Sequence, residues 1–449
     1  MRRGTLAWLP LLLVSACGGE AAKTLSREQL LDPASCADCH QSHVDQWQGS
    51  MHAYAADDPV FLAMNQRGQE ETQGALGDFC VNCHAPMAVR EGATTDGLNL
   101  GELPQYLKGV TCYFCHSVDA VEGTHNNPLR LADDLVLRGA IRDPYDNEAH
   151  LAGYSPLLDR NDRSASDLCG SCHDIVLDNA VHLERTYSEW QASLFGNGSS
   201  GGLGCGNCHM AGDEAPAASV DGVPLREVHD HRMPGVDIAL TPWPFHDEHR
   251  AQVEAELLGT LVGQMCIPPP LAETTVEVTL ENAFAGHSFP SGAAHDRRAW
   301  LELVVYDETE QVIFETGVIA ADEATAEVAD DNLWLLRDHV RKADGSDAHM
   351  FWEVASVESE LLDQAATSGP GAVHAKTRTF TIPLSAGLPA RATMRVLMRP
   401  LGLEVLADLV QSGHLDPSIP DVVPTFEVIR QVEWVQARDG YGCVPPGVF

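Results

Sequence analysis

The sequence has few basic residues and, beyond its first residues, no long apolar run. It contains 28 lysines and arginines against 65 aspartates and glutamates, which gives a formal net charge of −37 at pH 7. Such an acidic surface repels nucleic acid and anionic lipid headgroups and attracts cationic partners, although acidity can also serve solubility alone. With no basic patch, low-complexity tract or spanning segment, the composition excludes a nucleic-acid-binding protein and a protein with membrane-spanning helices.

Five copies of Cys-x-x-Cys-His are present in the first half of the chain. In a c-type haem site the two thiols form thioether bonds to the porphyrin, and the histidine that follows is the proximal ligand of the iron. Chance alone would produce roughly 0.02 such pentads at this composition. The motifs therefore predict five covalently bound haem c groups with their iron, held by Cys36, Cys39 and His40; Cys80, Cys83 and His84; Cys112, Cys115 and His116; Cys169, Cys172 and His173; Cys205, Cys208 and His209.

Zinc and disulfides are the two other uses of closely spaced cysteines. A structural zinc site takes four ligands, commonly from two Cys-x-x-Cys pairs, so the pairs come in even numbers. Here the pairs number five and each carries a histidine at the same place. Cysteines three positions apart, repeated five times, also suit a disulfide framework poorly. Haem attachment is the better interpretation.

The N-terminus has the pattern of an exported lipoprotein. Two arginines precede an apolar stretch at residues 6–14, and Ser15 and Ala16 then lead to Cys17. This pattern is typical of a secretory signal peptide and is too short to span a membrane. It resembles a bacterial lipobox, which implies lipidation of Cys17, a signal peptide at 1–17 and a lipid anchor in the cell envelope. Because Gly18 follows and no aspartate does, the resemblance favours the outer membrane, on its periplasmic or its surface face. An ordinary signal peptide with a chance cysteine is the alternative.

The cysteine count leaves two residues unassigned. Of the 13 cysteines, ten belong to haem motifs and one to the lipobox, so Cys266 and Cys443 remain. In an oxidising compartment two leftover cysteines most simply form a disulfide. We expect this bond to tie the end of the chain to the beginning of its second domain.

The pattern of the chain changes after the last haem motif. We expect a pentahaem cytochrome c domain at 30–240, a connecting helix and proline joint at 241–270, and a β-sandwich-like domain at 271–449. The helix is expected over 245–265, before three prolines. The fold class is thus α+β, a loop-rich, mainly helical pentahaem domain followed by a β-sandwich-like domain. Alternating or apolar stretches predict strands at 276–280, 300–306, 312–314, 377–382, 392–398 and 426–434, with a short helix at 403–410.

Several segments resemble one superfamily of multihaem cytochromes. The first motif is followed by Trp47-Gln-Gly-Ser-Met-His52-Ala, which is similar to the opening of the cytochrome c554 and hydroxylamine oxidoreductase group. Further similarities are Gly109-Val-Thr before the third motif, the fifth motif with Met210, His231-Arg-Met-Pro-Gly, and the stretch from Asn282 through His287 to Trp300. The resemblance implies a pentahaem member of this superfamily. It does not imply the activity of the pentahaem nitrite reductases, because the chain has no Cys-x-x-Cys-Lys. It does not imply the activity of the octahaem oxidoreductases either, because the chain has five sites rather than eight.

The distal ligands decide whether any iron is open to chemistry. In the related group, the histidine corresponding to His52 ligates the iron of a different haem. On this basis the distal candidates are His52, His231, His150, His287 and His125. His287 can instead support the Pro-Gly turn, and His125 can be an exposed loop residue.

Two functions follow from the two possible states of the fifth iron. If all five irons have two ligands, the protein is an electron carrier. It is then a c-type multihaem cytochrome transferring electrons along a haem relay at the cell envelope. Its partners would be redox proteins or a terminal acceptor. If one iron is open, it is an oxidoreductase acting on a small nitrogen or sulfur compound, with His125, Arg130 or Arg138 near the open face. The carrier is the favoured reading, and a surface adhesin whose β-domain does the binding is a third one.

Overall fold

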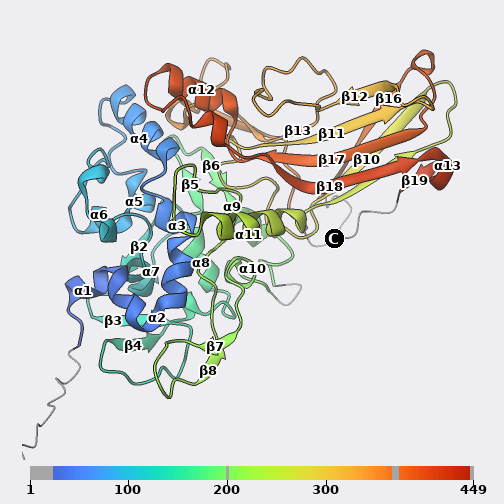
Figure 1. The fold of residues 1–449 in the computed structure, drawn as a ribbon. Coiled ribbons are helices and arrows are strands. Elements are labelled where there is room, and N and C mark those ends of the chain that lie inside the picture. The colour runs from blue at the N-terminus through green and yellow to red at the C-terminus, as the bar shows by residue number, and fades with distance from the viewer. Residues whose placement is uncertain (1–23, 199–201, 367–373, 445–449) are drawn as a thin grey trace, which may run out of the picture.

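The structure, a computed structural model, describes residues 24–198, 202–366 and 374–444. Short helices and small two-stranded sheets make up the region before residue 240, and two larger sheets dominate the region after it (Figure 1). The predicted α+β class is confirmed. Cys17 and the whole signal sequence lie outside the described residues.

The first region is built from short helices. Asp32 caps α2 (Pro33–Gln48) by accepting a hydrogen bond from the Ala34 amide, and Pro33 occupies the first helical turn, where no amide donor is needed. The other helices are α1 (Arg27–Leu31), α3 (Met51–Tyr54), α4 (Pro59–Glu71), α5 (Val81–His84), α6 (Pro86–Arg90), α7 (Cys112–His116), α8 (Ala165–Gly170), α9 (Thr186–Ala192) and α10 (Cys205–His209).

Four small sheets complete this region. Three are antiparallel pairs and one, β3 with β4, is parallel. The strands are β1 (Val118–Val121) with β2 (Leu129–Leu131), β3 (Val136–Gly139) with β4 (Leu151–Tyr154), β5 (Asp174–Val176) with β6 (His182–Arg185), and β7 (Glu214–Pro216) with β8 (Leu225–Glu227). Such short strands bury little apolar surface on their own, which fits a region whose interior is completed by porphyrins.

The second region contains two large antiparallel sheets. One has the order β16-β10-β9-β19, and the other has the order β12-β11-β17-β18 with β13 paired to β11. The strands are β9 (Val262–Ile267), β10 (Thr274–Glu281), β11 (Arg298–Tyr306), β12 (Val312–Thr316), β13 (Leu335–Leu336), β16 (Ala375–Ile382), β17 (Arg391–Arg399), β18 (Phe426–Val435) and β19 (Gly442–Cys443). A separate pair, β14 (Asp338–Arg341) with β15 (Ser356–Ser359), lies beside the first region. Helix α12 (Leu403–Gln411) and a last turn, α13 (Gln436–Asp439), complete it.

The two large sheets share one hydrophobic core. Val276 and Val278 of β10, Leu303 of β11 and Val396 of β17 are all fully buried in a single cluster. On β10 every second residue points outward, as in a sandwich with one inner face per sheet. Helix α11 (His246–Leu258) covers an end of this core by contributing Val253, and it packs against β18 (Figure 1).

The predicted connecting helix ends earlier than the sequence indicated. Helix α11 stops at Leu258, and Val262–Ile267 form strand β9, with every second residue buried. Pairing with β10, from Val262 against Glu281 to Cys266 against Glu277, overrides the helical spacing of the apolar residues. The prediction of a helix to 265 is therefore wrong, and the β-region begins before the three prolines.

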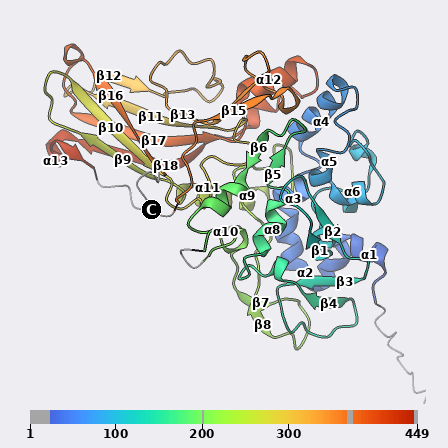
Figure 2. The same cartoon turned by 180° about the vertical axis from the view of Figure 1, so that it is seen from behind.

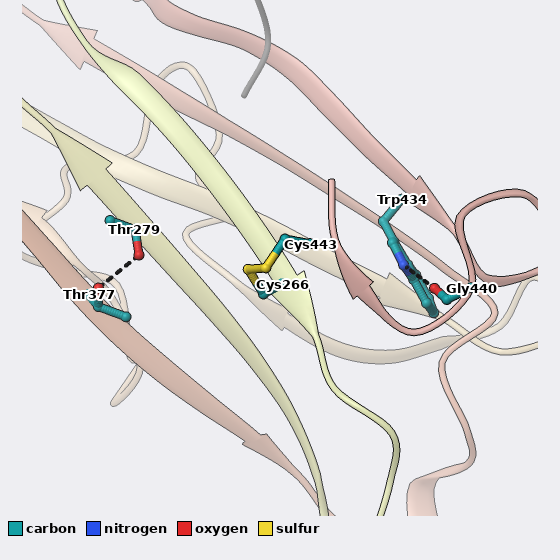
Figure 3. The surroundings of a disulfide bond; sticks show 6 residues. All are labelled: Cys266, Thr279, Thr377, Trp434, Gly440 and Cys443. Atoms are coloured by element: carbon teal, nitrogen blue, oxygen red, sulfur yellow. Dashed lines mark hydrogen bonds between the residues drawn. A yellow bond between two sulfur atoms is a disulfide. The ribbon is translucent and has the colours of Figure 1, made fainter. Parts of the chain in front are cut away.

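The leftover cysteines are joined in the structure. Cys266 on β9 and Cys443 on β19 form a disulfide, and their residues are paired across the sheet (Figure 3). The bond fastens the last strand to the edge of the four-stranded sheet. Trp434 supports the same end of the sandwich, because its indole nitrogen donates to the Gly440 carbonyl at 2.9 Å.

The second region is docked on the first through α12 and α4. Val60 and Ala63 of α4 share a buried cluster with Leu406 and Leu409 of α12, and both figures show the two helices side by side (Figures 1 and 2). Arg67 of α4 also binds Asp408 at 3.0 Å. No helix among the described residues combines the length and the apolar character needed to cross a membrane.

Candidate haem sites

Four proximal histidines face a second histidine at nearly the same separation. Because a bond from a metal ion to an imidazole nitrogen is about 2 Å long, two imidazoles on opposite faces of one iron have ring centres about 6 Å apart. The ring centroids are 6.3 Å apart for His40 and His150, 6.4 Å for His116 and His231, 6.2 Å for His173 and His52, and 6.4 Å for His209 and His287. The donor set and spacing at these four places fit a haem iron with two histidine ligands.

The outer nitrogens of the proximal histidines are held by backbone carbonyls. Nδ1 of His40 lies 2.7 Å from the Ala217 carbonyl, and Nδ1 of His209 lies 2.7 Å from that of Pro234. His116 is held in the same way by Arg138. A hydrogen bond from Nδ1–H to a carbonyl sets the tautomer and leaves Nε2 free to ligate a metal.

The distal histidines are held by carbonyls close to them in sequence. Nδ1 of His231 lies 2.9 Å from the His229 carbonyl, and Nδ1 of His287 lies 2.9 Å from that of Ser288. His150 lies 3.1 Å from the Leu151 carbonyl. These three rings are therefore oriented by their own turns, with Nε2 available.

Burial keeps the buried members of these pairs neutral. Desolvation, together with the neighbouring His173, lowers the pKa of His52 to about 3. Desolvation likewise lowers the pKa of His231 to about 3 and that of His287 to about 4. Only a neutral imidazole can ligate a metal, so these histidines are in the ligating form at pH 7.

Gly109 explains why His52 lies where it does. Its φ is +67°, and a Cβ added there would come within 2.5 Å of the His52 carbonyl oxygen. The next amide, that of Val110, donates to the same oxygen at 2.8 Å, and the indole of Trp47 donates to the Val110 carbonyl at 2.7 Å. A residue with a side chain at 109 would push the His52 segment away.

His84 of the second motif differs from the other proximal histidines. Its Nδ1 lies 3.1 Å from the Ala55 carbonyl, as expected of a ligand. Its ring, however, is stacked on Phe61, with centroids 4.1 Å apart and planes 2° apart. In the described part of the chain, no second histidine ring faces it at the spacing of the other four sites. The structure therefore places no second histidine opposite His84 within the described residues.

His125 does not complete the second site. Its side chain is exposed, and its Nδ1 lies 3.2 Å from the Thr124 hydroxyl. The turn that carries His125 does contact the second motif, because the side-chain amide of Asn82 donates a hydrogen bond to the Asn126 carbonyl at 3.3 Å. The structure thus brings the turn to the motif but does not place the imidazole opposite His84.

Arg130 and Arg138, the two arginines expected near an open haem face, also form their contacts away from the second site. Arg130 is half-exposed and binds Asp119 and Glu122, each at 3.0 Å. Arg138 binds Asp134 at 3.0 Å, and its carbonyl holds His116 of the third site. Neither guanidinium is directed to the second site.

Four histidines of the second region lie close to carboxylates. The pairs are His339 with Glu360 at 3.5 Å, His349 with Asp408 at 3.0 Å, His374 with Glu281 at 3.2 Å and His414 with Glu70 at 3.1 Å. None of these side chains faces a haem motif, in agreement with their exclusion from the distal candidates.

Comparison with known proteins links the first part of the chain to a family. Residues 35–117 match the family model described as cytochrome c554 and c-prime. The matched residues contain the first three motifs and His52, so this part of the chain is similar to that family.

The fold of the chain is also found among solved structures. The crystal structure of a penta-heme cytochrome c552 from Thermochromatium tepidum aligns with 93% of this chain and 100% of its own, with a TM-score of 0.61 and 20% identity. At that identity the likeness concerns the fold alone. No curated protein matches the chain.

The five motifs of the chain lie next to one another in a definite order. Cys112 of the third motif contacts Cys36 of the first, which raises the pKa of Cys112, and Cys205 of the fifth contacts Cys169 of the fourth, which raises the pKa of Cys169. Cys83 of the second motif likewise has its pKa raised by Cys172 of the fourth. Burial raises the pKa of Cys115, and so does nearby Cys172, which links the third and fourth motifs. The sites therefore follow the order first, third, fourth and fifth, and the second adjoins the fourth.

Proposed function

We propose that the protein is a pentahaem electron-transfer cytochrome of the cell envelope. Haem c supplies one-electron chemistry at its iron, and two histidine ligands favour electron transfer over substrate binding. The observation that carries the proposal is the set of four histidine pairs with ring centroids 6.2 to 6.4 Å apart. The contacts between motifs supply the continuity that a relay needs.

The net charge supports a cationic partner. At −37, the chain carries a large excess of carboxylates, and haem propionates would add to it. A field of this sign concentrates positively charged partners and speeds their encounter. We infer that the electron donor or acceptor docks through a basic surface.

A lipid anchor is part of the proposal. The sequence ending at Cys17 supports export and lipidation, which would hold the relay at the outer membrane. The variant Cys17→Ala should release the protein from the membrane fraction in its bacterial host without changing its haem content. Retention of this variant in the membrane fraction would show that the anchor is elsewhere.

Mass spectrometry and EPR test the relay directly. The intact mass should exceed that of the mature peptide by five haems, and a smaller excess would show an unused motif. EPR of the oxidised protein should show low-spin signals from four haems with two histidine ligands. High-spin signals from most of the haems would contradict the relay.

A second function is supported at the second motif alone. Phe61 stacks on the face of the His84 ring, beside the direction of an iron bound to Nε2. Among the described residues no histidine ring faces His84 at the spacing of the other four pairs, so one iron would have its second axial position open to an exogenous ligand. Such a site would suit a haem oxidoreductase acting on a small nitrogen or sulfur compound. The fourth site adjoins it and would exchange electrons with it.

A ligand titration distinguishes the two functions. We expect one high-spin haem per molecule, converted to low spin by cyanide or nitrite. The variant His125→Ala should leave this signal unchanged, because its side chain points to Thr124 and solvent. If the oxidised protein has no high-spin haem, the second function fails and the relay remains.

A further inference from the structure

Three charged side chains meet in the interior between the haem region and the sandwich. The Arg297 guanidinium donates to both carboxylate oxygens of Asp237, at 3.0 and 2.9 Å. Glu184 lies nearby: a Cβ added to Gly292 would be 3.5 Å from Arg297 Nη2 and 3.9 Å from Glu184 Oε2. We call Glu184, Asp237 and Arg297 the charge cluster.

Each member is linked through the backbone to a histidine of the fourth or fifth site. Glu184 on β6 is paired with Ile175, two residues after His173. Asp237 follows Pro234, whose carbonyl holds His209. Arg297 ends the turn that begins at His287. The backbone thus brings one charge from each ligand-bearing segment to the same place.

Arg297 is held rigidly in this position. Its side chain is 11% exposed, and its Nε donates to the Ser291 carbonyl at 2.9 Å. The Gly292 amide donates to the Thr186 hydroxyl at 3.0 Å, which fastens the turn to the haem region. A fixed charge with little exposure to water exerts a strong field on its neighbours.

The cluster therefore lies beside the fourth and fifth sites. Glu184 is paired with a residue two positions after His173, and Asp237, which binds Arg297, lies three positions after Pro234, whose carbonyl holds His209.

We propose that the charge cluster sets the reduction potentials of the haems at the fourth and fifth motifs. Arg297 raises them because a positive charge disfavours the ferric iron, and Asp237 and Glu184 lower them for the opposite reason. The inference rests on the proposed relay. It adds that three named charges determine the driving force of its last steps.

Spectroelectrochemical titration of charge variants tests this inference. In Arg297→Gln the potential of at least one haem should fall enough to change its ratio of reduced to oxidised iron about tenfold, which is about 59 mV for a one-electron couple. Asp237→Asn should shift a potential upward, and Arg297→Lys should stay near the native value. Glu184→Gln should shift a potential upward at pH 8, where the native carboxyl is ionised.

A second arginine–carboxylate pair supplies the matched control. Arg395 binds both carboxylate oxygens of Glu302, at 2.6 and 2.9 Å, on the sandwich and away from every haem motif. Arg395→Gln should leave all five potentials unchanged. A merely structural role for Arg297 would lower thermal stability without opposite shifts of potential in the arginine and aspartate variants.

The outcomes separate the inference from the relay itself. If Arg297→Gln loses haem, the isosteric variants Asp237→Asn and Glu184→Gln carry the test. Unchanged potentials, or shifts of one sign in all variants, in a protein with five haems and native EPR would overturn the inference and leave the relay standing. Loss of the low-spin signals in the native protein would instead overturn the relay.

Discussion

At the scale of single residues, the histidines opposite the motifs govern what each iron can do. His52 lies 117 positions before Cys169, where the fourth motif begins, and its ring faces His173 of that motif with ring planes 84° apart. Its position depends on Gly109, where no side chain fits. An iron that loses one of two histidines becomes high-spin and open to small ligands.

Substitution of His52 should open the fourth site. His52→Ala is expected to raise the high-spin content from one haem per molecule to two, as measured by EPR of the oxidised protein. His125→Ala is the matched control and should add none. Equal high-spin content in native protein and His52→Ala would remove His52 from the ligands.

At the scale of elements, α4 links the second site to the sandwich. Asp58 caps this helix by accepting hydrogen bonds from the amides of Val60, at 2.7 Å, and Phe61, at 3.2 Å. It thereby places Phe61 on His84, while the opposite side of the helix packs on α12. Burial raises the pKa of Asp58 to about 6, although the two amide hydrogen bonds oppose the shift.

Asp58 should make stability depend on pH. Because its folded-state pKa lies above its unfolded value, its ionisation destabilises the fold: stability is full below about pH 4 and declines as the pH rises through about 6. Asp58→Asn keeps the cap without the charge. The difference in Tm between this variant and the native protein should grow from pH 4 to pH 7 in favour of the variant, by the equivalent of up to about 3 kcal/mol. Parallel Tm profiles of the two proteins would contradict this.

The elements also show where sequence reasoning succeeded and where it failed. The strands expected at 276–280, 300–306 and 392–398 were found in β10, β11 and β17 because each alternates or stays apolar between turns. The helix expected to reach 265 ended at Leu258, because the following residues pair with a strand that begins only at Thr274. The spacing of apolar residues within one segment does not show which other strand that segment will pair with.

At the scale of the whole molecule, charge should control the rate of electron exchange. With a net charge of −37, the protein should react faster with a small basic redox protein than with an acidic one of similar size and potential. Stopped-flow rates with the basic partner should fall by about tenfold as ionic strength rises from about 0.01 to about 0.15 M, because screening shortens the Debye length. A rate independent of salt would contradict electrostatic docking.

The sequence by itself determined how haem is attached, because Cys-x-x-Cys-His is a local motif whose chemistry needs only adjacent residues. It also singled out His52, His150, His231 and His287, although not their partners. Only the tertiary structure paired His40 with His150, stacked Phe61 on His84 and gathered Glu184, Asp237 and Arg297, since these contacts join segments far apart in the chain. Whether an iron is open, and what its reduction potential is, depends on side chains that tertiary contacts bring to it. A pattern along the sequence does not show these contacts.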